Sequence, residues 1–256
     1  MNKVFVFCEG PTDQVIYATV KESLSQVQVP AEKPISVGGK SNFHPRILET
    51  VAPELTAGEP GSYTSILVFR DRDAGEEPSA IQDAFAGIAR ELLRQWQLQP
   101  AFAPVQSWPN LFRLDEPPTL ERPGLCLVLH IAAPPQLENL SLKNLTTDGY
   151  VLALALQDEV LERFAVESKV KSSSDVLRKL ITHEVPEAIS NGGIVFDEDK
   201  DYLAAYLCAA RFWTVRRAEE KERLLHVILD RALRYTPEAF RCVLNSWGAA
   251  MKEVMR

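Results

Sequence analysis

The sequence predicts an α/β protein in which a mostly parallel sheet flanked by helices is followed by a helical C-terminal region. Near-continuous apolar runs at residues 4–8 and 65–69 are typical of strands buried on both faces. Segments with apolar residues at helical spacing alternate with these runs, which indicates parallel strands joined by right-handed crossovers. Beyond about residue 139 the apolar spacing is almost wholly helical.

Each element is expected from its own pattern and from the turn residues that bound it. The expected elements are strands at 4–8, 35–37 and 65–69, helices carrying Val15 to Leu24, Ile47 to Leu55 and Ile81 to Trp96, and a glycine turn at 38–42. Strand-like segments at 101–105, 112–114 and 125–131 are separated by proline-rich turns. They are expected to extend the same sheet, with a hairpin at one edge. We therefore place an α/β domain at residues 1–135 and a helical region at residues 136–256.

Within the helical region, capping residues mark where helices begin. Expected helices run from Thr147 or Asp148 to about Phe164, from the serines at 172–174 past Ile181, from Asp197 or Asp199 to Trp213, and over 219–235 and 237–255. The acidic run at 197–201 is interpreted as a solvated helix start.

Composition excludes several classes of protein. The net charge of −7 over 256 residues argues against a generic nucleic-acid coat, which would be basic, although it leaves open a metal enzyme that acts on phosphodiesters. No apolar run approaches the roughly 20 residues that cross a membrane, and the start of the chain does not resemble a signal peptide. The four cysteines form no CxxC pair, which predicts a reducing, cytoplasmic setting without structural zinc.

Acidic residues follow two of the predicted strands. Glu9 comes directly after the strand at 4–8, and Asp71 and Asp73 follow the strand at 65–69. In open α/β sheets the carboxyl ends of the strands are where ligands bind. Converging carboxylates repel one another unless a cation lies between them, and hard oxygen ligands suit Mg²⁺ or Mn²⁺. The three carboxylates are therefore expected to lie close enough to share one cation.

Together these motifs resemble a Toprim domain over roughly residues 1–135. The resemblance rests on Glu9-Gly10-x-Thr12-Asp13, on Gly38-Gly39-Lys40 and on a strand that ends in Asp71-x-Asp73. The Toprim fold is shared by topoisomerases, bacterial primases, small RNA-maturing nucleases and the OLD-family nucleases of phage defence. The Glu-Gly-x-Thr-Asp form is most similar to OLD-like and stand-alone Toprim proteins.

The resemblance implies roles for individual residues. Glu9 corresponds to a metal ligand that is also a general acid or base, Asp71 and Asp73 to residues that hold divalent metal, and Asp13 to a further ligand in the OLD-like branch. Proteins of that branch often carry another acid and a lysine in later helices, for which Asp148 and Lys169 or Lys171 are candidates. Gly38, Gly39, Lys40 and Arg72 are candidates for binding phosphate or substrate.

The implied function is metal-dependent cleavage or transfer at DNA or RNA phosphodiesters, as in a nuclease of phage defence or DNA repair. Two alternatives stay open: a non-catalytic binding or regulatory subunit of a defence or repair assembly, and a phosphohydrolase of small nucleotides. A protein partner or a homo-oligomer is compatible with each of them.

The sequence departs from the family pattern at Arg70 and Arg72, which flank Asp71. Arginines there can pair with the acids and weaken metal binding, or can bind a phosphate. Purely structural roles are also open: Glu9 or Asp13 as acids at a helix N-terminus, Asp71 and Asp73 as turn formers, and Gly38-Gly39-Lys40 as an ordinary turn.

Overall fold

The computed structural model describes residues 3–24, 26–137, 140, 142–167, 173–213 and 221–256. They form two compact units, one comprising Met1–Ala132 with Asn245–Arg256 and the other comprising Ala133–Leu244. The sequence placed one boundary after residue 135 and assigned everything beyond it to the helical region. The segment Asn245–Arg256 belongs instead to the first unit.

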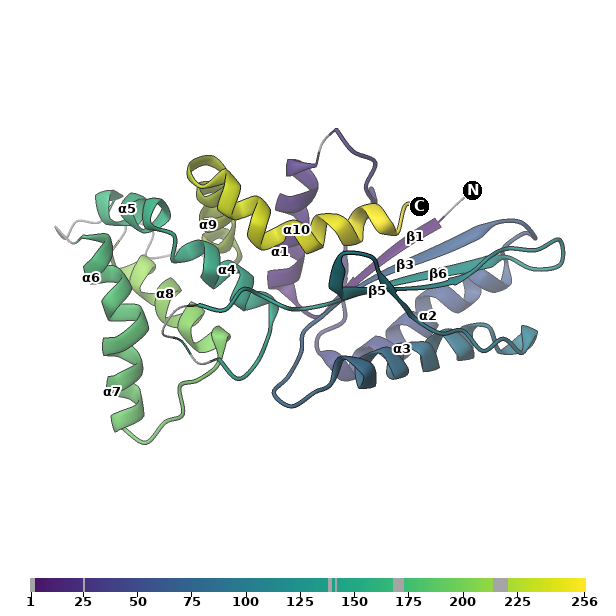
Figure 1. Cartoon of the computed structure of the whole chain (residues 1–256), viewed down its shortest axis with the longest axis horizontal. Coiled ribbons are helices and arrows are strands. Elements are labelled where there is room, and N and C mark those ends of the chain that lie inside the picture. The colour runs from purple at the N-terminus through teal and green to yellow at the C-terminus, as the bar shows by residue number, and fades with distance from the viewer. Residues whose placement is uncertain (1–2, 25, 138–139, 141, 168–172, 214–220) are drawn as a thin grey trace. The chain divides into compact units, whose positions relative to one another are not determined.

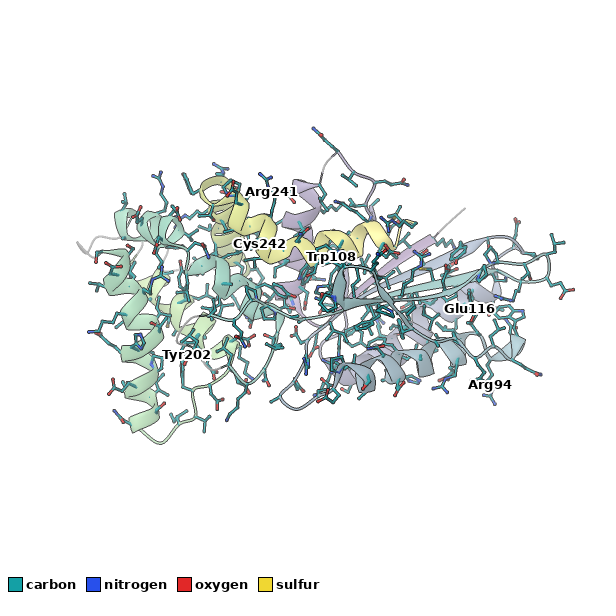
Figure 2. The ribbon with its side chains drawn as sticks, viewed as in Figure 1. Arg94, Trp108, Glu116, Tyr202, Arg241 and Cys242 are labelled. Atoms are coloured by element: carbon teal, nitrogen blue, oxygen red, sulfur yellow. The ribbon has the colours of Figure 1, made fainter. Side chains whose placement is uncertain are left out.

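The first unit is built on a six-stranded sheet with the strand order β2-β1-β3-β6-β5-β4 (Figure 1). The strands are β1 (Lys3–Cys8), β2 (Ile35–Ser36), β3 (Tyr63–Arg70), β4 (Ala103–Val105), β5 (Trp108–Glu116) and β6 (Gly124–Ile131). Strands β2, β1, β3 and β6 run parallel to one another. Figure 2 labels Trp108 and Glu116, the first and last residues of β5.

The other two ladders of this sheet are antiparallel, so the sheet is mixed. Strand β5 pairs antiparallel with both β4 and β6, which confirms the expected hairpin at one edge. Gln106 and Ser107 alone connect β4 to β5, and a parallel pair needs a crossover of a dozen or more residues. Ser107 adopts a positive φ of 72°, as a tight hairpin turn requires.

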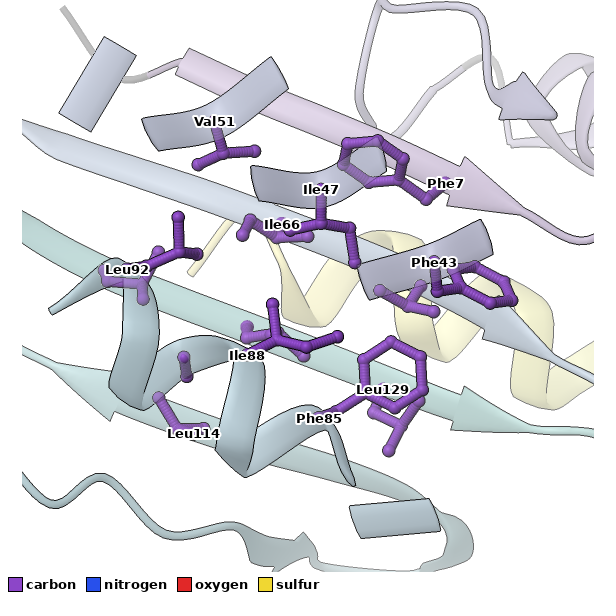
Figure 3. Close-up of a cluster of buried hydrophobic side chains, with 14 of the residues drawn as sticks. Phe7, Phe43, Ile47, Val51, Ile66, Phe85, Ile88, Leu92, Leu114 and Leu129 are labelled. Atoms are coloured by element: carbon purple, nitrogen blue, oxygen red, sulfur yellow. The ribbon is translucent and has the colours of Figure 1, made fainter. Parts of the chain in front are cut away.

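Helices cover both faces of the sheet, as the sequence predicts. Helices α2 (Phe43–Thr56) and α3 (Pro78–Leu92) pack on one face through an apolar core, and α1 (Pro11–Ser23) lies on the other. Figure 3 shows Phe43 and Ile47 of α2 and Phe85 of α3 against Phe7 and Leu129 of the strands. These side chains alternate along each strand with those that face α1.

The C-terminal end of α10 (Pro237–Glu253) completes the second face of this sheet. The Trp247 ring is fully buried and stacks on Phe69 of β3, with ring centroids 4.0 Å apart and an interplanar angle of 10°. Arg113 of β5 donates to both the carbonyl and the carboxylate of Glu253. These contacts place the end of α10 in the first unit.

His130 of β6 is buried beside this stack, and its protonation is expected to make the stability of the protein depend on pH. Its Nε2 lies 2.9 Å from Ser246 Oγ, and burial lowers the pKa of His130 to about 3. In the unfolded chain His130 binds a proton below pH ~6.5, whereas the folded chain excludes it down to about pH 3. Its contribution is therefore fully present above pH ~6.5 and declines as the pH falls toward 3.

We expect the free energy of unfolding to fall by about 2 kcal/mol between pH 7 and pH 5 because of His130 alone. Urea denaturation at the two pH values, in the wild type and in a His130→Gln variant, measures this term as the difference between their pH dependences. Equal pH dependences in the two proteins would contradict it.

The described part of the second unit consists mainly of helices, as expected. They are α4 (Thr147–Ala155), α5 (Asp158–Glu167), α6 (Ser174–Lys179), a π-helical turn (Leu180–Glu184), α7 (Val185–Asn191), α8 (Asp199–Trp213) and α9 (Lys221–Tyr235), together with the first turns of α10. The single helix expected from residue 147 or 148 to about 164 was wrong, because the chain breaks at 156–157. Asp158 and Glu159 begin the new helix, where acids are stabilised by its N-terminus.

None of the helices in the described residues is long and apolar enough to cross a membrane.

Candidate functional site

The carboxyl ends of β1 and β3 lie side by side. The two strands are neighbours in the sheet, and Cys8 at the end of β1 is in register with Phe69 of β3. Glu9 and Arg70 are therefore the next residues after this pair on the two strands, and Asp71 follows Arg70. The sequence predicted that these two strand ends would converge, and the register confirms it.

The Gly38-Gly39 turn holds the backbone of Glu9. The amides of Gly38 and Gly39 donate to the Glu9 carbonyl over 3.1 and 3.3 Å, and the amide of Val37 donates to Cys8. The two glycines adopt φ values of 73° and 118°, which side-chain-bearing residues rarely adopt. Both amides are engaged in this turn, so phosphate binding by this segment stays a prediction that rests on Lys40.

Arg70 lies between the carboxylates and is itself buried. Its Nη1 is 3.5 Å from Glu9 Oε2 and also donates to the carbonyl of Asp71. Its Nη2 lies 3.0 and 3.2 Å from the two carboxylate oxygens of Glu76. The guanidinium thus supplies the positive charge between Glu9 and Glu76, which is the pairing that the sequence raised as one alternative.

The segment from Asp71 to Glu76 is tied into a compact turn. The amide of Asp73 donates to the Glu76 carboxylate over 3.2 Å, and Arg72 Nε donates to the Glu76 carbonyl over 2.8 Å. The carboxylate of Asp73 forms an ion pair with Lys40. Three segments that are distant in the sequence, at Glu9, Lys40 and Asp71–Glu76, are thereby linked by direct contacts.

Glu76 was missed by sequence reasoning. It contacts both Arg70 and the amide of Asp73, and so it positions the acidic turn. In the sequence it follows Gly75 and precedes Glu77 and Pro78, where an acid is typical of a helix start. The one available signal was its spacing of three residues from Asp73, which is compatible with a closed turn.

Asp13 has the structural role that the sequence left open. Its carboxylate accepts the amide of Gly10 over 2.7 Å at the first turn of α1, and the residue is buried. This is how an acid at the third helical position satisfies a free N–H group. Metal binding by Asp13 stays a prediction.

The pKa of the Cys8 thiol is raised by its burial and by nearby acids. Burial raises the pKa of the Cys8 thiol far above its ordinary value, and the negative charges of Asp13, Asp71 and Glu9 raise it further. Cys8 is therefore a protonated, unreactive thiol beneath the strand ends. The carboxylates of Asp13, Asp71 and Glu9 thus all raise the pKa of this one thiol.

A cation shared by the carboxylates of Glu9, Asp71 and Asp73 stays a prediction. Among the described residues, no group of three or more His, Cys, Asp or Glu side chains is arranged to hold one ion. The Lys40 ammonium is paired with Asp73, and the Arg70 guanidinium is paired with Glu9. Both acids thus attract a positive charge. Mg²⁺ commonly binds through one or two carboxylates together with substrate phosphates, and Asp71 and Asp73 fit that pattern.

Of the remaining candidates, the structure describes Asp148 only. Asp148 is in the second unit at the start of α4, where its Oδ2 is 3.8 Å from Lys221 Nζ. Its Oδ1 is buried with no hydrogen-bond partner among the described residues. Lys169 and Lys171 fall outside the described residues.

The acidic run at 197–201 includes the predicted helix start, since α8 begins at Asp199, but the prediction that the run is solvated was wrong for Asp199. Asp199 is fully buried and accepts hydrogen bonds from the amide and hydroxyl of Thr146, over 2.9 and 2.8 Å. Burial raises the pKa of Asp199, and the charge of Asp148 raises it further. A Cβ on Gly149 would lie 2.8 Å from Asp199 Oδ2, so this close approach requires glycine.

Comparison with known proteins establishes similarity of fold alone. The structure resembles the crystal structure of a hypothetical protein from Pyrococcus horikoshii OT3, with a TM-score of 0.53 and 14% sequence identity. The match covers 100% of this chain and 98% of the other. No known family matches the sequence. No curated protein matches it either.

Proposed function

We propose that this protein is a divalent-metal-dependent nuclease or related phosphotransferase of the Toprim type, acting on the phosphodiesters of DNA or RNA. One observation supports this above all. Glu9, the Gly38–Lys40 turn and the Asp71–Asp73 segment are far apart in the sequence and lie in direct contact at the carboxyl ends of β1 and β3. These segments are the ones on which the resemblance to Toprim proteins rests.

Each residue has a distinct part in the proposed reaction. Mg²⁺ or Mn²⁺, when bound, stabilises the negative charge that develops on a phosphate and on its leaving oxygen. Asp71 and Asp73 would supply the carboxylates that hold the ion. Glu9 retains a partly exposed carboxylate and accepts or returns a proton at the attacking or leaving oxygen. Lys40 pairs with Asp73, and Arg72 lies between Asp71 and Asp73 in the chain, so the charge of both residues suits a phosphate at this site.

A second candidate is favoured by the internal ion pairs. Because Glu9 contacts Arg70 and Asp73 contacts Lys40, each of these two acids is paired with a cation of the chain. Such a site can persist without metal, as in a Toprim-type binding or regulatory subunit of a larger assembly. The two functions differ in whether a phosphodiester is cleaved.

The test is incubation of the purified protein with single- and double-stranded DNA, RNA and free nucleotides, in Mg²⁺, in Mn²⁺ and in EDTA. We expect cleavage of a polynucleotide in the presence of metal and none in EDTA. Turnover of free nucleotides alone would indicate a phosphohydrolase. Binding of nucleic acid or protein without any cleavage would favour the regulatory subunit and contradict the proposed reaction.

A further inference from the structure

We propose that the Arg70 guanidinium permanently fills one cation position of this site, so that the site takes a single Mg²⁺ or Mn²⁺ ion, held by Asp71 and Asp73 in place of Lys40. This inference rests on the proposed function, because it concerns the metal of the same site. It specifies that one ion binds, that this ion displaces Lys40 from Asp73, and that the released Lys40 can then bind a phosphate.

Arg70 is fixed in its position. Its side chain is only 6% exposed, and the guanidinium contacts Glu9, both carboxylate oxygens of Glu76 and the carbonyl of Asp71. Withdrawing one member of a buried ion pair leaves the others buried without a counter-charge, which is strongly unfavourable. A divalent ion entering from solvent therefore does not displace Arg70.

Lys40 is held far less firmly. Its side chain is 50% exposed and that of Asp73 is 42% exposed. Ion pairs between exposed side chains contribute little, because water screens the attraction and a long lysine side chain loses freedom on pairing. A divalent cation carries twice the charge of an ammonium group and can take its place on Asp73.

The charges of the cluster match this division. Arg70 lies between Glu9 and Glu76, and these two acids share its single positive charge. Without Lys40, Asp73 loses the ammonium group paired with it, and a divalent ion can take that place. A second divalent ion would have to bind at Glu9, where the guanidinium already stands and would repel it.

Displacement of Lys40 links metal binding to substrate binding. While it is paired with Asp73, the ammonium group is engaged and its charge is compensated. When an ion binds at Asp71 and Asp73, Lys40 is released within reach of the same site and becomes available to a phosphate oxygen. The protein then presents its phosphate-binding lysine only in the metal-loaded state.

Calorimetric titration with Mn²⁺ tests the inference without any activity measurement. We expect one ion per wild-type chain and binding about fivefold tighter in a Lys40→Ala variant, because a competing ion pair of up to ~1 kcal/mol is removed. A Lys33→Ala variant serves as the matched control, since Lys33 is an exposed lysine of the same unit. Its Mn²⁺ affinity is expected to equal that of the wild type.

The outcomes separate this inference from the proposed function. Two Mn²⁺ ions per wild-type chain would overturn the role of Arg70, and unchanged affinity in Lys40→Ala would overturn displacement of Lys40. Either result leaves a metal-dependent nuclease intact. Absence of Mn²⁺ binding by the wild type, even with nucleic acid added, would contradict the proposed function itself.

Discussion

Replacing Asp71 with asparagine is expected to reduce metal-dependent cleavage at least about 100-fold at a fixed Mg²⁺ concentration. Asparagine preserves the size of the side chain and removes one of the two charges that balance the ion. Metal ions stabilise transition-state charge by several kcal/mol, and each ~1.4 kcal/mol is a tenfold change in rate. Initial rates on the best polynucleotide substrate, measured over a range of Mg²⁺ concentrations, give the size of the loss.

The matched control for this variant is Asp83→Asn, which makes the same chemical change at an exposed position on α3 of the same unit. Its cleavage rate is expected to equal that of the wild type. If Asp71→Asn retained activity within about twofold of the wild type, Asp71 would not be a metal ligand and the proposed site would be wrong.

The second large effect concerns Trp247. We expect Trp247→Ala to lower the free energy of unfolding by about 3–5 kcal/mol, the range for removing a large aromatic side chain from a core. The residue is fully buried and its ring stacks on Phe69, so alanine would leave a cavity against β3. Urea denaturation followed by circular dichroism measures the loss.

A Trp247→Phe variant distinguishes the stacking contact from the helix that carries it. Phenylalanine keeps an aromatic ring over Phe69 and is expected to lose clearly less stability than alanine. If the free energy of unfolding of the alanine variant lay within ~1 kcal/mol of the wild-type value, the end of α10 would not be an essential part of the first unit.

The features that could be predicted from the sequence are those with a local signature. The runs that became β1 and β3 are nearly all apolar, as strands covered on both faces must be. Glu9 follows the first run directly and Asp71 follows the second after Arg70, so the two acids come close together if the strands are neighbours in the sheet. The proline-rich turns between the strand-like segments after residue 100 likewise indicated a hairpin.

The features that were missed depend on partners distant in the sequence. The amphipathic pattern of α10 shows that one face is buried, but it does not specify the sheet that covers it. Asp199 stands in a polar run, and its burial depends on Thr146 and on the missing side chain of Gly149. The role of Arg70 likewise depends on Glu76, whose carboxylate reaches back only because the turn after Asp73 is closed.

The contribution of α10 to the sheet also bears on how the protein forms during synthesis. Trp247 and Phe69 are separated by 178 positions in the chain (247 − 69). A ribosome adding about 5–20 residues per second needs on the order of ten seconds or more to bridge that interval. Strands β1, β2 and β3 exist throughout this time, and β4, β5 and β6 during the later part of it, without the segment that covers one face of the sheet. The emerging chain thus carries an apolar sheet surface for a chaperone to shield, and this surface closes only after the intervening helices have left the ribosome.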